Sequence, residues 1–147
     1  MDEAERRSWM AVLARADADA LASALAGLPD LPEWRVLRGP ESGLVMVRGR
    51  AGGGGAAFNL GEMTVTRCTV RVPSGEVGHA YVAGRDRRRA ELAAAVDALM
   101  QRADLREAVN RAIVRPLARA QEAAREVVAA KAAATRVQFF TMATMRS

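Results

Sequence analysis

The stretch from Gly78 to Leu92 contains the residues of this chain that are best suited to chemistry. An alternating strand pattern runs through Gly84 into a helical pattern, and the first turn of that helix is crowded with arginine. Arginine near a helix N-terminus opposes the macrodipole, so local stability does not explain this crowding. A conflict between a local rule and the sequence is typical of functional or partner-binding sites.

An anion-binding helix start is the first hypothesis for this stretch. Asp86 is placed to cap the helix, so that backbone N–H groups of the next turn face an anion. Arg67 and Arg71, on the preceding strand, are predicted to stand over the small residues Gly78 and Ala80. A solvated charged face is the alternative. The candidate anion or partner contacts are Arg67, Arg71, Arg85, Asp86, Arg88 and Arg89.

The only histidine, His79, is the only possible source of imidazole catalysis. A two- or four-residue loop after Val72 would place His79 and Tyr81 on the apolar face, opposite Val70 and Cys68. No carboxylate is then positioned to orient the ring, so we predict a core histidine. Cys68 is predicted to be a small buried hydrophobe rather than an activated thiolate.

Other catalytic signatures are missing from the sequence. We find no nucleophile–base pair, no paired carboxylates and no HExxH spacing, and a single cysteine excludes an internal disulfide or a Cys-rich zinc site. The run Gly52–Gly55 could cradle a phosphate, but no Gly-Lys-Ser/Thr follows it and a strand pattern comes next. We therefore expect a flexible hairpin connection there, no catalytic residue, and no cofactor or metal bound by this chain.

Hydrophobic periodicity predicts the elements that position these residues. Helices are expected over 3–16, from Asp17 or Asp19 to Pro29, and from 86 onward in three apolar stripes, the last containing Ala124 and Val127. Strands are expected over 34–37, 44–47, 57–60, 63–72 and 77–82. Residues 44–47 are apolar on both faces, as in a covered central strand. The prediction is one α+β domain over 1–147, an antiparallel sheet of four to five strands flanked by N-terminal and C-terminal helices.

The apolar tail from Arg136 to Met142 would fray unless it packs against something. Packing onto the domain and docking into another subunit both remain open, and deletion after Thr135 is expected to be costly either way. The candidate subunit-interface residues are Trp9, Met10, Phe139, Phe140 and Met142.

Charge points to an acidic partner, a nucleic acid or a phosphorylated ligand, because the net charge is +5 and the pI about 10.8. Lys131 is the only lysine among the 22 basic residues, a bias that a GC-rich genome would also produce. No secretory signal and no run long enough to span a bilayer are seen, so we expect a cytoplasmic protein without membrane contact.

Five sequence blocks, which follow one another along the chain in the same order as in the family, resemble PhnG proteins. These are small subunits of the bacterial carbon–phosphorus lyase system of phosphonate breakdown. The Gly78-His79-Ala80-Tyr81-Val82-x-Gly84-Arg85-Asp86 block is the strongest of them. The other blocks are Trp9-Met10-Ala11-Val12-Leu13-Ala14, Glu41-Ser42-Gly43-Leu44-Val45, Thr64-Val65-Thr66-Arg67 and Arg136-Val137-x-Phe139-Phe140-Thr141-Met142.

The resemblance implies a hetero-oligomeric core complex with PhnH, PhnI and PhnJ subunits. With PhnI as the catalytic partner, that complex would displace adenine from ATP with methylphosphonate, giving α-D-ribose 1-methylphosphonate 5-triphosphate. The resemblance implies no catalytic residue here, so this chain would be a required non-catalytic subunit of a transferase complex.

Two other classes of function are alternatives to this one. A free-standing basic nucleic-acid-binding module is favoured by the pI alone, since the strands lack an exposed aromatic pair and no helix-turn-helix signature is present. An independent phosphotransferase is disfavoured by the missing P-loop and metal ligands.

Overall fold

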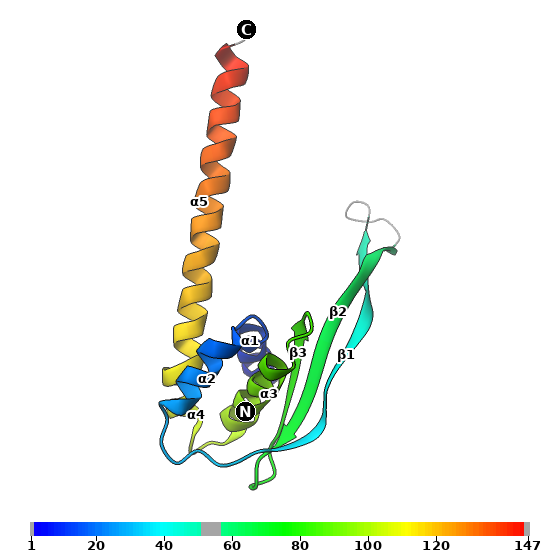
Figure 1. Cartoon of the computed structure of the whole chain (residues 1–147). Helices are drawn as coiled ribbons and strands as arrows, with labels where there is room; N and C mark the ends of the chain where they lie inside the picture. Colours follow the sequence, from blue (N-terminus) through cyan, green and yellow to red (C-terminus); the bar gives the residue numbers. More distant parts are fainter. Residues whose placement is uncertain (1, 51–56, 146–147) are drawn as a thin grey trace.

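One buried helix, α3 (Arg87–Gln101), lies between the sheet and the N-terminal helices (Figure 1). We call this packed part of the molecule the body. The computed structural model describes residues 2–50 and 57–145. Helices α1 (Glu3–Ala14) and α2 (Ala18–Ala26) pack against α3 on the side away from the sheet. A short α4 (Arg106–Val109) follows α3. The predicted α+β class and the two N-terminal helices are confirmed.

Within residues 2–50 and 57–145 the sheet has three antiparallel strands in the order β1–β2–β3, so the prediction of four to five strands was wrong. The two strands expected at 34–37 and 44–47 are one continuous strand, β1 (Arg35–Arg50). Those expected at 57–60 and 63–72 likewise merge into β2 (Ala57–Arg71). The return strand is β3 (Val77–Ala83). The Gly52–Gly55 loop lies outside the described residues.

A bulge explains why β1 looked like two strands. Glycine and proline at 39–40 indicate a break in the sequence, but here the register with β2 merely shifts between Arg38 and Glu41. Gly39 has φ 79°, and a Cβ at this position would lie 2.6 Å from the carbonyl oxygen of Arg67. An edge strand tolerates such a bulge because its outer side has no neighbouring strand.

The hairpin between β2 and β3 corrects the predicted faces of β3. Its loop has three residues, 73–75, closed by hydrogen bonds between Val72 and Glu76 (3.1 Å) and between Gly75 and Val72 (2.9 Å). Gly75 supplies the left-handed conformation this turn needs, with φ 108°. Thr69 therefore pairs with His79, a shift of one residue that moves every β3 side chain to the opposite face.

The corrected register makes His79 and Tyr81 exposed and places Gly78, Ala80 and Val82 against α3. The prediction of a core histidine was wrong. Gly78 leaves no room for a ligand, because a Cβ there would lie 1.9 Å from the carbonyl oxygen of Ala94. The alternation predicted for β2 is confirmed. Its buried face consists of Thr66, Cys68 and Val70, with Val72 just beyond the strand.

The C-terminal helical run is continuous from Arg106 and leaves the body. A π-helical turn, η1 (Asn110–Val114), precedes α5 (Arg115–Met145). Pro116 cannot donate a backbone hydrogen bond, and a wider turn ahead of it accommodates this loss. Beyond Gln121, whose side chain donates to the carbonyl of Val12 (2.9 Å), α5 projects away as a single helix (Figure 1). Ala124 and Val127 are exposed, so the third predicted stripe is not a core stripe.

Candidate binding surfaces

The interior of the body is organised around one buried carboxylate, Asp97 on α3. It accepts hydrogen bonds from Trp9 Nε1 (2.8 Å), from the backbone N–H of His79 (2.9 Å) and from Arg6 Nη2 (2.9 Å). Asp97 thereby joins α1, α3 and β3, and the hydrogen bond from Arg6 compensates the buried charge. The pKa of Arg6 is raised, first by its hydrogen bond to Asp97.

Trp9 is a core residue that contributes to this hydrogen-bond network. The indole is 3% exposed, so its side chain is not available to a partner on the surface of this chain, contrary to the expected interface role. Met10 is half-buried and packs against the core. Phe139, Phe140 and Met142 fall within α5, but their side chains lie outside the described part of the chain.

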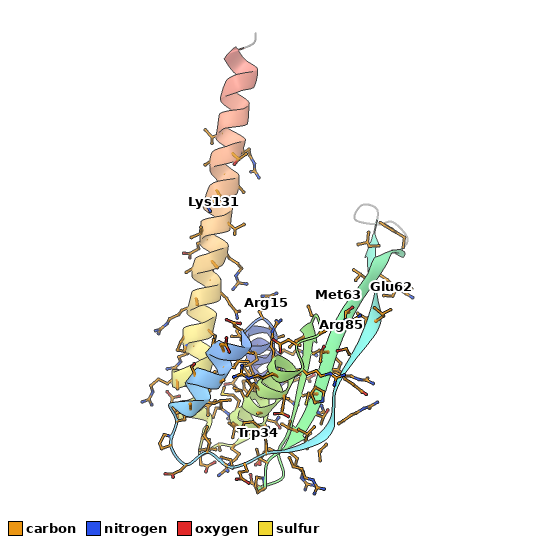
Figure 2. All side chains as sticks on the ribbon, viewed as in Figure 1. Arg15, Trp34, Glu62, Met63, Arg85 and Lys131 are labelled. Atoms are coloured by element: carbon orange, nitrogen blue, oxygen red, sulfur yellow. The ribbon has the colours of Figure 1, made fainter. Side chains whose placement is uncertain are left out.

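The start of α3 confirms the predicted cap. Asp86 accepts a hydrogen bond from the backbone N–H of Arg89 (3.0 Å). The guanidinium of Arg89 donates to the carbonyl of Ala14 on α1, and Arg88 pairs with Asp19 on α2 (2.8 Å). These two arginines therefore hold α3 against α1 and α2. Arg85 is exposed and forms no ion pair with the described residues (Figure 2).

The six predicted contacts do not form one cluster, because Arg67 and Arg71 lie on the face of the sheet turned away from α3. We call this outer face the basic face. Cross-strand pairs there bring Arg35 opposite Arg71, Glu41 opposite Arg67 and Arg38 opposite Thr69. The residues that make up the basic face are Arg35, Arg38, Glu41, Arg67, Thr69, Arg71, His79 and Tyr81.

Glu41 lies between two arginines of the basic face. It accepts hydrogen bonds from Arg67 Nε (2.6 Å) and Arg38 Nε (3.2 Å). The hydrogen bond from Arg67 lowers the pKa of Glu41 most, with a smaller effect from Arg38. Glu41 therefore stays ionised and fixes the orientation of both guanidinium groups.

A second surface is an apolar ribbon, residues 43–50 of β1 with 57–64 of β2. β3 pairs with β2 only from Val65 onward, so this part of the sheet has two strands and rises beyond the body (Figures 1 and 2). Leu44 and Met46 lie on one face and Val45 and Met63 on the other, and all four are exposed. The covered central strand predicted at 44–47 is therefore an uncovered edge strand.

Exposure of the ribbon's apolar side chains to water is energetically unfavourable. Two-stranded ribbons are marginally stable alone, and contiguous exposed apolar residues mark interaction surfaces in folded proteins. Its large exposed apolar side chains are Leu44, Val45, Met46, Phe58, Leu60 and Met63.

Metal binding and thiol chemistry can each be checked against the described residues. No group of three or more His, Cys, Asp or Glu side chains could hold a metal ion within 2–50 and 57–145. Burial raises the pKa of the Cys68 thiol, which disfavours the thiolate. In the same part of the chain, no helix combines the length and hydropathy needed to cross a bilayer.

Sequence reasoning missed Asp97, Arg38 and Glu41, and it placed His79 and Tyr81 on the wrong face. Asp97 could have been found, since it is the only acidic residue in the apolar middle of the α3 sequence. The glycine at position 75 was the available signal for a three-residue loop.

Fold and surfaces define a small α+β protein with two projections, an apolar ribbon and a long helix, which suit it to association. The family described as "Phosphonate metabolism protein PhnG" matches residues 4–145. The chain is 51% identical over 139 residues to the alpha-D-ribose 1-methylphosphonate 5-triphosphate synthase subunit PhnG of Rhizobium meliloti (strain 1021), covering 95% of this chain and 88% of that protein. The chain belongs to the PhnG family.

Proposed function

We propose that this chain is a non-catalytic subunit of a synthase complex that makes α-D-ribose 1-methylphosphonate 5-triphosphate. The support is its 51% identity to a protein named as a subunit of that synthase. The reaction would displace adenine from ATP with methylphosphonate during phosphonate degradation. A PhnI-type subunit would supply the catalytic groups, and PhnH-type and PhnJ-type subunits would complete the complex.

The apolar ribbon is the observation that carries this proposal. The body already has a closed core around Leu13, Leu21 and Leu99, so the ribbon contributes nothing to it. Leu44 is 64% exposed and Leu60 62%, and burial against a partner would remove this apolar area from water. A subunit that acts through assembly needs such a surface, whereas a free-standing protein does not.

Co-purification tests the proposal. A tagged chain is expressed with the PhnH-, PhnI- and PhnJ-type subunits of the same genome, and the complex is isolated through the tag. We expect all four chains to elute together and the Leu44→Glu variant to lose its partners. Leu37→Glu is the matched control, because Leu37 is also on β1 and half exposed but lies outside the ribbon.

Recovery of a lone monomer from the wild-type coexpression would count against a subunit role. Equal loss of partners in Leu44→Glu and Leu37→Glu would remove the ribbon from the proposal. Adenine release from ATP, dependent on methylphosphonate and on this chain, tests the assigned reaction separately.

The alternative of a nucleic-acid-binding module rests on the basic face. Single-strand binding proteins stack successive bases on aromatic side chains. Apart from the imidazole of His79, Tyr81 is the only aromatic ring of the basic face, and one such pair is a small surface for stacking successive bases. A titration on random-sequence DNA at low salt decides the matter: saturable, salt-dependent binding would support the module.

A further inference from the structure

The basic face contains an electrostatic conflict that the fold does not resolve. Arg35 and Arg71 are directly opposite each other on β1 and β2, and like charges in that position destabilise a sheet. Both side chains belong to exposed residues, and neither forms an ion pair with any residue in 2–50 or 57–145. Glu41 is the only carboxylate of the basic face, and it already serves Arg38 and Arg67.

Arg38 and Arg67, the two arginines bound to Glu41, keep hydrogen-bond donors that Glu41 does not use. Each uses only its Nε toward the carboxylate, at 3.2 Å from Arg38 and 2.6 Å from Arg67. Their Nη groups make no hydrogen bond to any described residue. Glu41 thus orients two guanidinium groups without using their terminal N–H groups, which are the groups that bind oxyanions in pairs.

His79 and Tyr81 add further hydrogen-bond donors beside these arginines. His79 Nδ1 lies 3.1 Å from the hydroxyl of Thr69, its cross-strand partner. In the tautomer in which that hydroxyl donates to Nδ1, the ring proton is on Nε2, and Nε2 can donate to a ligand. Tyr81 is opposite Arg67, so its hydroxyl belongs to the same neighbourhood.

These groups line one depression on the basic face, with a volume of about 130 Å³. Its lining residues are Arg38, Arg67, Thr69, His79 and Tyr81, together with Cys68, whose side chain belongs to the buried face of β2. We propose that this depression binds the phosphoryl or phosphonyl group of a ligand, held by the guanidinium groups of Arg38 and Arg67 and by His79 and Tyr81. The choice of phosphorus oxyanions rests on the proposed function; the presence of a site rests on the geometry alone.

A tetrahedral dianion suits this donor set better than a carboxylate does. The two guanidinium groups, the imidazole Nε2 and the phenol together offer more donors than the two oxygens of one carboxylate can accept. A phosphonate or terminal phosphate presents three oxygens and up to two negative charges. Such a dianion would also offset the repulsion between Arg35 and Arg71 nearby.

The single histidine makes a direct experiment possible. In the NMR spectrum of the full-length chain, every imidazole signal comes from His79. We would titrate the chain with methylphosphonate and with tripolyphosphate at constant ionic strength, and with acetate as the carboxylate probe. Saturable shifts of the His79 signals are expected with at least one phosphorus anion. The tighter of the two then identifies a phosphonyl or a phosphoryl ligand.

Matched double variants separate a site from general charge attraction. Arg38→Gln/Arg67→Gln is expected to weaken binding at least tenfold, and Tyr81→Phe severalfold. Arg111→Gln/Arg125→Gln removes the same charge from exposed arginines that also pair with glutamates, Glu107 and Glu122. This control is expected to bind within twofold of wild type.

Three results would overturn the site: no saturable shift with either phosphorus anion, acetate binding as tightly as methylphosphonate, or equal weakening in both double variants. A His79 shift that appears only when partner subunits are added would assign the depression to a partner's acidic side chain instead. Failure of the anion-binding test would not change the interpretation of the co-purification experiment, because that experiment tests the ribbon and not the basic face.

Discussion

The indole Nε1 of Trp9 donates a 2.8 Å hydrogen bond to the carboxylate of Asp97, so a residue expected on an interface is a buried link between α1 and α3. The same carboxylate accepts from Arg6 and from the backbone of His79. The backbone N–H of His79 is thus bound to the buried Asp97, while the imidazole ring of the same residue is exposed on the basic face. One buried charge positions both the N-terminal helix and the strand that carries the proposed oxyanion site.

Substitution Asp97→Asn should be strongly destabilising. It leaves the guanidinium of Arg6 without its counter-charge, and breaking a buried ion pair costs about 3–5 kcal/mol. Because Arg6 is 26% exposed, we expect the lower end, about 3 kcal/mol, in urea-induced unfolding. Arg7→Gln breaks an exposed pair with Glu3 and should cost under about 1 kcal/mol. Similar losses in both variants would show that Asp97 is not the central tie.

A methyl group at Gly78 should not be tolerated. Its Cβ would lie 1.9 Å from the Ala94 carbonyl oxygen and 2.6 Å from the Ala98 nitrogen, so β3 must move away from α3. We expect Gly78→Ala to lower the free energy of unfolding by about 3 kcal/mol or more, above the usual range for overpacking. Gly43→Ala is the control, because a Cβ there meets nothing within 4 Å. A Gly78→Ala protein as stable as the Gly43→Ala protein would contradict the close approach.

Modification of the only histidine tests the hairpin register. Since His79 is exposed, diethyl pyrocarbonate should modify the folded chain at a rate within a few-fold of that of free imidazole. The absorbance of the carbethoxy product gives the rate directly. A histidine that reacts only after denaturation would instead support the register with a two- or four-residue loop.

The Cys68 thiol should be protected in the folded chain. Burial raises its pKa, so at pH 8 the thiolate fraction is smaller than that of a free cysteine, and the residue is also 2% exposed. Iodoacetamide labelling followed by mass spectrometry should be slow in buffer and fast in denaturant. The rate should rise with pH beyond the range in which an exposed thiol levels off. Rapid labelling of the native chain at pH 8 would contradict the buried position.

Truncation within α5 separates folding from assembly. The side chains of residues 122–137 are exposed, and α5 from Glu122 to Met145 extends about 35 Å past Gln121, whose side chain bonds to Val12 of α1. A chain ending at Ala130 should therefore unfold at the same urea midpoint as the full chain. In the co-purification assay the shortened chain should lose its partners. This loss is expected because it lacks the segment after Thr135, whose deletion the sequence predicts to be costly. A large drop in the midpoint would show that the tail packs onto the body.

Local patterns predicted most of the secondary structure. The helical stripe of α1, the Asp86 cap and the alternation of β2 are short-range properties, set by periodicities of 3.6 and 2 residues and by one side-chain hydrogen bond. One of the two extra strands was expected because Gly39-Pro40 resembles a break in sequence, whereas a bulge carries β1 through it; the other was expected because β2 was divided between residues 60 and 63.

The candidate sites depended on relationships that no local pattern contains. A three-residue loop closed by Gly75 exchanged the two faces of β3, which moved His79 and Tyr81 from the predicted core to the basic face. Arg38 and Glu41 reached that face only through the bulged pairing of β1 with β2. The sequence by itself determined the element types, the arginine-rich surface and the family. Tertiary structure decided which of these side chains meet, since register and packing join residues far apart in the chain.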